Sequence, residues 1–437
     1  MAPLKVSGVA SLVFAVVACV QPQMHSEAVL NAGPMLGDIT TDSVQIWAAA
    51  DTPMRFSVEL KTVDGEWQAA VNNPVLLLSN NAHPRGSCEI TGLSADTEYQ
   101  YRLVTSDGVV EAESTQQFRT SGADKFRVAF GSCAGDWGPD PSQSIFKTIA
   151  EQHPQWFLWM GDNIYYSRAR QEWNDIEMMR ERWKIQRSLP HLQELLSSTA
   201  HASVWDDHDY GPNNSDKTYF LRDESFELYK SYWPNPYFGS ADDGVYFTLH
   251  LNGVDVFMLD TRFNRQPNKL DVKDKELLGE RQWRWLEGEL RDSTASFKII
   301  VSGMQLLAEY HSYESWAMFG SEKQRLLDYV KQHKINGIVL LSGDRHIGEI
   351  LRDDLVLDYP VIEFTSSPLA AGVGGSTSDE IATRRIANSE ITAEHFGILD
   401  FDFSGTDPTL IYSAMGQRGE QLGLSYTLRA SQLMSPQ

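Results

Sequence analysis

The chain has 437 residues, of which 42% are hydrophobic, and its 12 Trp and 16 Tyr are typical of a folded protein with a large core. Its length favours two or more domains. The formal net charge of −22 argues against nonspecific binding to nucleic acid or to an anionic membrane surface. An acidic chain that handles anions needs bound cations to reverse the sign of the local field.

The N-terminus has the pattern of a bacterial export signal. A single lysine precedes an apolar run over residues 6–18, which is too short to cross a bilayer because a span takes roughly 20 apolar residues. The run ends in Val16-Val17-Ala18-Cys19, which resembles a lipobox, so we expect removal of residues 1–18, lipid on Cys19 and a tether over residues 19–27. The alternative is an ordinary signal peptide that contains a cysteine. Because Val20 replaces the aspartate that often retains lipoproteins at the inner membrane, we expect an exported, outer-membrane or periplasm-facing lipoprotein.

The two other cysteines lie in different predicted domains. A disulfide between Cys88 and Cys133 is possible in an oxidising compartment. However, Cys88 belongs to a predicted strand and is expected to be a small buried residue, whereas Cys133 lies in a segment with candidate metal ligands. Of these two cysteines, we therefore expect only Cys133 to take part in the functional site.

Residues 28–120 have the pattern of an all-β domain. Short alternating runs are separated by turn residues, at 43–50, 54–60, 87–93 and 99–105. About seven strands in such a length suit a fibronectin- or immunoglobulin-like sandwich, and the segment 92–99 resembles the approach to a tyrosine-bearing strand of fibronectin type III modules. No group of candidate catalytic or metal-binding residues occurs in this region, so we expect a scaffold or docking module followed by a linker at residues 120–124.

From residue 125 to residue 437 the pattern changes to alternating strands and helices. Continuous apolar runs predict strands buried on both faces, at 126–130, 156–160, 202–205, 254–259, 297–303 and 337–342. Helical periodicity is found at 143–152, 280–290 and 322–333. This alternation predicts an α/β domain with a covered sheet.

Four segments end an apolar run on side chains that bind metals. They are VAFGSCAGDW (128–137), FLWMGDNIYY (157–166), SVWDDHDYG (203–211) and IVLLSGDRHIG (338–348). Ligands of α/β proteins collect on loops outside the strand ends, so we expect these side chains to meet. The pattern predicts metal-dependent hydrolysis.

The side chains of the first two segments differ in the metals that they prefer. Asp162 follows Gly161, so its carboxylate can leave the sheet unobstructed and can bridge two cations. Tyr165 offers a phenolate that trivalent iron stabilises far below the usual pKa of about 10. Cys133 offers a thiolate, which suits iron or zinc better than calcium or magnesium.

The other two segments add carboxylates and imidazoles. Asp344 and His346 are separated by one residue, so both side chains could point toward one metal centre. Residues 206–209 place three carboxylates around His208. Like charges at this density are costly unless cations neutralise them. Each motif has a structural alternative, namely a turn or helix cap, an inert buried cysteine, or a histidine in a surface ion pair. All four in one domain favour a functional site.

From about residue 27 onward, the chain resembles the alkaline phosphatase D family of PhoD-like metallophosphatases. The matching segments are Gly131-Ser132-Cys133, Gly161-Asp162-x-Ile164-Tyr165, Asp206-Asp207-His208-Asp209, Leu259-Asp260-Thr261-Arg262, Ser342-Gly343-Asp344-x-His346 and the strand 396–403. The resemblance implies an all-β sandwich followed by an α/β metallophosphoesterase-like domain, itself a β-sandwich flanked by helices.

The resemblance also implies a cluster of one iron(III) (Fe3+) and calcium ions (Ca2+). Its carried-over ligands are Cys133, Asp162, Tyr165, Asp344 and His346. Asp207 would be a further ligand, with Asp206 as its competitor. By analogy with the Asn-His pair of other metallophosphoesterases, His208 would face the scissile group as general acid or transition-state stabiliser.

Substrate contacts are less constrained by these motifs. Arg262 and Arg345 are candidates for bidentate phosphate contact, and a structural ion pair is the alternative for each. The loop after Asp209 reads YGPNNSD, without the acidic residue that the family commonly has two places further on, which leaves substrate choice open.

We therefore predict a phosphatase or phosphodiesterase of the cell envelope. It would be a monomer, held to a membrane by its lipid anchor, that acts on small-molecule or polymeric phosphoesters and has no surface for nucleic acid. One alternative is a phospholipase-like or wall-polymer phosphodiesterase, which needs a groove open to a long substrate. Another is a non-catalytic surface lipoprotein whose sandwich binds a partner, against which the intact set of candidate ligands argues.

Overall fold

The computed structural model describes residues 30–71, 75–78, 83–105, 108–109, 116–241, 243–309, 312–376 and 384–436. The predicted signal peptide, Cys19 and the tether therefore lie outside the described residues. In the part of the chain that is described, no helix has the length and apolar character needed to cross a bilayer. Cys88 and Cys133 are both free, and Cys88 is half-buried, not buried as predicted.

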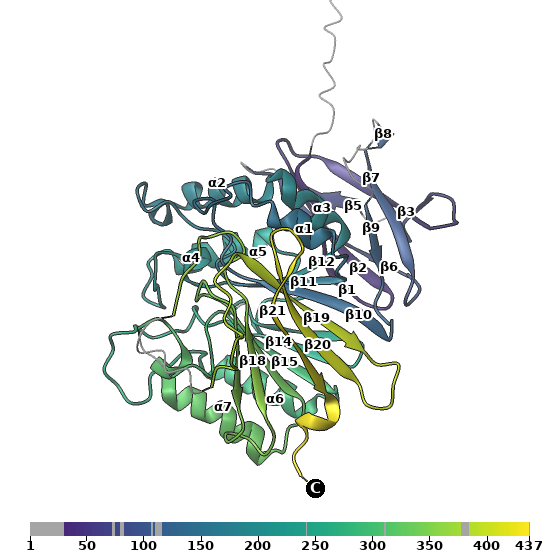
Figure 1. Ribbon diagram of the computed structural model, residues 1–437. Coiled ribbons are helices and arrows are strands. Elements are labelled where there is room, and N and C mark those ends of the chain that lie inside the picture. The colour runs from purple at the N-terminus through teal and green to yellow at the C-terminus, as the bar shows by residue number, and fades with distance from the viewer. Residues whose placement is uncertain are drawn as a thin grey trace, which may run out of the picture.

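The N-terminal residues form strands that belong to two sheets (Figure 1). One group is antiparallel and consists of β1 (Leu30–Ile39), β2 (Ser43–Ala50) and β6 (Arg85–Thr91). The other sheet contains β3 (Arg55–Thr62), β4 (Gln68–Ala69), β5 (Val75–Leu77), β7 (Glu98–Thr105), β8 (Gly108–Val109) and β9 (Gln117–Arg119). In β3, Phe56, Val58 and Leu60 are buried while their neighbours are not, which is the period-2 pattern of a strand with one buried face.

The first of these groups continues into the rest of the chain as one sheet. Within the described residues its strand order is β21-β20-β19-β10-β11-β12-β1-β2-β6. β1 joins β12 (Ala200–Val204) in parallel, with Leu36 opposite Ala200. Tyr101 Oη also donates a hydrogen bond to the carbonyl of Ser197 at 2.9 Å. The two predicted domains thus share a sheet and pack directly on each other.

The central part of this sheet carries the first site motifs. β10 (Lys125–Gly131), β11 (Trp156–Met160) and β12 are parallel, and β11 and β12 are buried along their whole length. Three antiparallel strands complete its other edge, namely β19 (His395–Asp402), β20 (Thr409–Gly416) and β21 (Gln421–Arg429). The predicted strands at 126–130 and 156–160 are confirmed.

A second sheet carries the remaining motifs. Its order is β13-β14-β15-β16-β18-β17 among the described residues, and β14, β15, β16 and β18 are parallel. The strands are β13 (Phe247–Leu251), β14 (Val254–Met258), β15 (Phe297–Ser302), β16 (Ile338–Ser342), β17 (Glu349–Asp353) and β18 (Val361–Thr365). The predicted apolar runs at 254–259, 297–303 and 337–342 are therefore confirmed as strands.

Helices lie at both sides of the paired sheets (Figure 1). The longer ones are α2 (Ile176–Arg187), α3 (Pro190–Ser198), α5 (Arg222–Tyr232), α6 (Glu280–Asp292) and α7 (Gly320–Gln332). Short ones are α1 (Ile145–Ala150), α4 (Asp207–Tyr210), η1 (Glu172–Asn174), η2 (Trp316–Phe319) and η3 (Ala430–Leu433). In α6, Trp283, Leu286 and Leu290 are buried on one face at helical spacing, as predicted.

Candidate metal centre

Four predicted ligands share an uncommon backbone conformation at strand ends. Cys133 lies two residues after β10, Asp162 lies two residues after β11, and Asp344 and His346 follow β16. Their φ angles are 64°, 51°, 65° and 56°. This left-handed region costs a residue with a side chain roughly 1–2 kcal/mol, and residues held there cluster at functional sites. The surrounding fold, not local preference, therefore aims these side chains.

Glycines allow the strand ends to approach each other. Gly161 has φ of 96°, and a Cβ there would lie 2.5 Å from Cβ of Asp206. A Cβ on Gly343 would lie 2.3 Å from Oγ of Ser132, which belongs to the other sheet's motif. Larger residues would push the motifs apart, so glycine allows the ends of β11 and β12 to approach at Gly161 and the two sheets to approach at Gly343.

A thiol and a phenol lie around one carboxylate, and an imidazole contacts the phenol. Tyr165 Oη donates a hydrogen bond to Asp162 Oδ2 at 3.0 Å, and Cys133 Sγ lies 3.7 Å from the same oxygen. Tyr165 Oη is also 3.2 Å from His346 Nε2. The predicted ligands from three separate strand ends are thus brought together within hydrogen-bonding distance.

The same carboxylate belongs to two groups with metal-binding geometry. The ligand atoms of Asp162, Asp207 and His208 lie within 4.8 Å of one another, as do those of Asp162, Asp206, Asp207 and Asp344. Asp162 and Asp207 are common to both groups. A carboxylate placed in this way can bridge two cations.

Asp207 and Asp206, the two competitors for one ligand position, have different surroundings. Asp207 lines the cavity in front of the cluster and accepts a hydrogen bond from the Asn214 amide at 2.5 Å, but its Oδ1 is buried without a hydrogen-bond partner. Asp206 pairs with Arg262 through Oδ1, and only its Oδ2 is without a partner. The geometry favours Asp207 as the ligand and gives Asp206 a supporting position.

Arg262 does not take the position predicted for a phosphate contact. It is fully buried and pairs with Asp206 and Glu314, and Arg265 reaches the same Glu314 at 2.6 Å. A guanidinium out of contact with water needs carboxylate partners of this kind. The structure therefore supports the alternative of an ion pair, which fixes the carboxylates behind the cluster.

Arg345 and His208 do face the cavity. The Arg345 guanidinium lies 3.9 Å from the ring centroid of Tyr313. The backbone N–H of His208 donates to Asp162 Oδ1 at 3.1 Å, and its ring is 4.3 Å from that of Tyr165. Both side chains could therefore reach a substrate bound at the cluster.

Burial shifts the protonation of the cluster away from its metal-binding form. It raises the pKa of Cys133 to about 12 and that of Asp344 to about 8, and raises the pKa of Asp162 well above its usual value. Burial also opposes ionisation of Asp207, but His208 and Arg262 hold its pKa below the usual value. Nearby cations would favour the charged forms again. The unpartnered carboxylate oxygens and the mixed donor set therefore fit a metal cluster.

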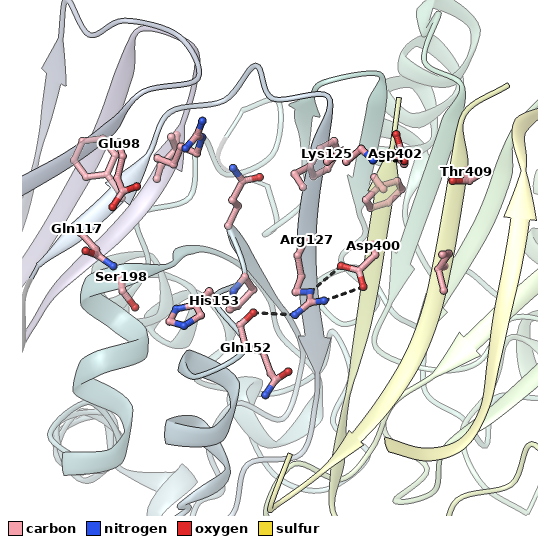
Figure 2. A pocket seen from close by; sticks show the side chains of 18 residues that line it. Glu98, Gln117, Lys125, Arg127, Gln152, His153, Ser198, Asp400, Asp402 and Thr409 are labelled. Atoms are coloured by element: carbon pink, nitrogen blue, oxygen red, sulfur yellow. Dashed lines mark hydrogen bonds and ion pairs between the residues drawn. The ribbon is translucent and has the colours of Figure 1, made fainter. Parts of the chain in front are cut away.

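Two cavities lined by described residues lie at opposite ends of β10. One, of about 950 Å³, is lined by Asp162, Tyr165, Asp207, Asp344 and His346. The other, of about 710 Å³, is shown in Figure 2 and contains no predicted site residue. There, Arg127 pairs with Asp400 at 2.7 Å and Lys125 pairs with Asp402 at 2.8 Å. Of these two, among the described residues, only the first combines access with buried metal-ligand atoms that lack a hydrogen-bond partner.

Several residues of the site were not identified from the sequence. Asn213 and Asn214 line the cavity and follow the acidic motif after Pro212, so their position in the chain could have indicated them. Glu314 and Trp137 also line the cavity. Glu314 lies in a segment without a motif, whereas Trp137 ends the first motif but is not a metal-ligand type.

Comparisons with known proteins give one consistent result. The family model of the PhoD-like phosphatases matches residues 128–410. Alkaline phosphatase D of Bacillus subtilis (strain 168) is 21% identical over 372 residues, which cover 72% of this chain and 64% of that protein. The match thus spans less than two thirds of the relative's length. A solved structure of PhoD is 18% identical, covers 95% of this chain and 92% of its own, and superposes with a TM-score of 0.75, so the fold is shared.

Proposed function

The chain belongs to the PhoD-like phosphatase family, and on this basis we propose that it hydrolyses phosphate esters at the cluster around Asp162. The observation that carries the proposal is a cluster beside a large cavity. Cys133, Tyr165 and Asp207 lie around this carboxylate, and His346 contacts Tyr165. A non-catalytic binding protein would have no need to hold three buried acids, a half-buried fourth and a strained backbone at such a cavity.

The proposed metals are iron(III) and calcium. Cys133, Tyr165 and His346 would hold iron together with Asp162, because thiolate, phenolate and imidazole suit iron. Asp207 and Asp344, again with Asp162, would hold calcium, which prefers carboxylate oxygens. Bound cations of this kind neutralise phosphoryl oxygens and lower the pKa of a nucleophilic water.

The chain's own residues would bind and orient the ester. Arg345 presents a guanidinium at the cavity wall, suited to two parallel hydrogen bonds with phosphoryl oxygens. Burial lowers the pKa of His208, so its imidazole is neutral near pH 7 and would donate an N–H to the reacting group. His208 is therefore proposed as a transition-state stabiliser. In such sites positioning and electrostatics supply most of the rate gain.

The cavity supports substrates larger than a simple phosphomonoester. Its volume of about 950 Å³ lies near the upper end of the range of small-molecule sites. We propose activity on both monoesters and diesters. A phospholipase-like or wall-polymer phosphodiesterase is the second candidate, and the same observation favours it.

We also propose the cellular setting that the sequence indicates. The export signal and Cys19 support an envelope lipoprotein, and the two sheets formed by β1–β9 support a fibronectin-like sandwich that acts as a scaffold. The protein is proposed to be a monomer without affinity for nucleic acid. Labelled palmitate should enter the wild-type protein, and Cys19→Ser should abolish the labelling; unchanged labelling would refute the anchor.

The activity is tested with purified protein supplied with iron and calcium. A chromogenic phosphomonoester and a chromogenic diester should both be hydrolysed. Tyr165→Phe should remove a visible charge-transfer band of the iron-loaded protein. No hydrolysis of either ester by protein with confirmed bound metals would overturn the proposed function.

A further inference from the structure

Trp137 is a large aromatic side chain left open at the wall of the catalytic cavity. Its side chain is 57% exposed, although it lines the same cavity as Asp162 and His346. Exposed indole surface forgoes the hydrophobic stabilisation that burial would give. A ligand that covers this surface would recover it.

The neighbours of Trp137 fix the orientation of its ring. The indole meets Tyr165 edge to face, with ring centroids 5.5 Å apart, and lies 6.2 Å from His346 at an interplanar angle of 25°. The backbone of Gly135 passes so close that a Cβ there would lie 2.7 Å from the indole nitrogen. The ring is thus held against the centre, while much of its surface remains open, so a binding group would meet a preformed face.

The position of Trp137 determines which part of a substrate it would touch. Both rings in contact with it belong to proposed metal ligands, Tyr165 and His346. A group stacked on the indole would therefore lie next to residues that hold the cluster. A substituent attached to the phosphate through its ester oxygen would reach this position.

Two pairs of opposite charges line the same cavity as Trp137. Asp136, its neighbour in the chain, forms an ion pair with Arg182 at 2.7 Å, and Glu172 pairs with Arg170 at 3.1 Å. All four line the cavity. A charged substituent would have to compete with these pairs, whereas an uncharged ring would not.

We propose that Trp137 forms a subsite for a planar ring on the phosphoester and so favours aryl or other ring-bearing esters over aliphatic ones. This inference rests on the proposed function, because it concerns the same cavity. Trp137 is here a specificity-determining residue that would contact the substrate by stacking.

Binding of phosphonates tests the subsite without turnover. Phenylphosphonate and methylphosphonate carry the same anionic group and differ in the ring. The metal-loaded wild-type protein should bind the phenyl compound more tightly. In Trp137→Leu, which keeps apolar bulk but lacks a flat face, this preference should fall about 5- to 10-fold, and Trp137→Phe should retain most of it.

Two controls make the result decisive. The metal content of each variant is measured, because Trp137 touches two proposed ligands. Phe220→Ala removes another exposed aromatic side chain, 66% exposed and absent from the cavity wall, and should keep the wild-type preference. Equal loss of both phosphonates in Trp137→Leu, or no preference in the wild type, would overturn the subsite.

The experiments distinguish a wrong proposed function from a wrong subsite. If metal-loaded wild-type protein hydrolyses no ester, the proposed reaction is wrong whatever the phosphonates show. If it hydrolyses aryl and aliphatic esters and Trp137→Leu lowers kcat/KM for both by the same factor, the reaction stands and the subsite is refuted.

Discussion

The two ends of β10 show how a structural cavity differs from a functional one. At the start of the strand, Arg127 and Asp400 form a two-point ion pair that is partly open to water (Figure 2). At its end, Asp162 and Asp207 are buried beside the half-buried Asp344, and a carboxylate oxygen of Asp207 has no hydrogen-bond partner. In the first cavity, the charges of the chain's own side chains balance each other. In the second cavity, cations from solution would balance the charge of the ionised carboxylates.

The largest effect is expected from Asp162→Asn. The amide keeps the shape of the side chain but removes the charge that Cys133, Tyr165 and Asp207 surround. We expect kcat/KM for a chromogenic phosphoester to fall at least about 100-fold, with loss of bound metal. Asp400→Asn, at the other end of β10, is the matched control. Comparable losses in the two variants would remove the distinction between the two cavities.

Arg262→Met should cause a large loss of stability. It leaves Asp206 and Glu314 buried without their shared guanidinium, so we expect about 3–5 kcal/mol less free energy of unfolding in urea. Activity should fall as well, because Asp206 adjoins Asp207. A variant with wild-type stability would show that other groups neutralise the negative charges of Asp206 and Glu314.

Metal removal should change the pH dependence of stability. Burial raises the pKa of Asp344 to about 8, whereas its unfolded value is near 3.8. Between these values the folded chain binds more protons, so the stability of the metal-free protein should decrease as the pH rises from about 4 to about 8. Bound cations should reduce this slope. Urea unfolding at several pH values, with and without a chelator, measures both, and identical slopes would contradict the account.

The smallest effect is expected from Arg127→Met in the balanced cavity. Its pair with Asp400 is partly exposed, with 34% of the arginine side chain accessible. Such pairs contribute about 0–1 kcal/mol, so stability should change by no more than this and activity should be retained. A loss of stability as large as that of Arg262→Met would show that solvent exposure does not explain the difference between the two ion pairs.

The sequence predicted local structure better than long-range pairing. The runs at 43–50 and 156–160 match β2 and β11, because buried strands have short apolar patterns. β1 was not identified, since Gly33, Pro34 and Gly37 interrupt its pattern. Its pairing with β12 joins residues far apart in the chain, which no local pattern contains.

The site could be predicted in part for the same reason. Ligand types at strand ends, together with the family resemblance, indicated residues that the structure brings together, such as Asp162 and Tyr165. For Arg262 the sequence left a phosphate contact and a structural ion pair open, because neighbouring residues do not show whether an arginine is buried. Trp137 was not identified because an aromatic residue beside a metal motif has no distinctive spacing. Pocket-lining roles of this kind depend on tertiary contacts.

The most direct test is the metal content of three proteins purified in parallel. Wild-type protein and Asp400→Asn should contain iron and calcium in amounts proportional to protein, and both should hydrolyse phosphoesters. Asp162→Asn should lose metal and activity together. An active wild-type protein without bound metal, or an Asp162→Asn variant with full metal content and full activity, would contradict the assignment of the buried carboxylates as a metal centre.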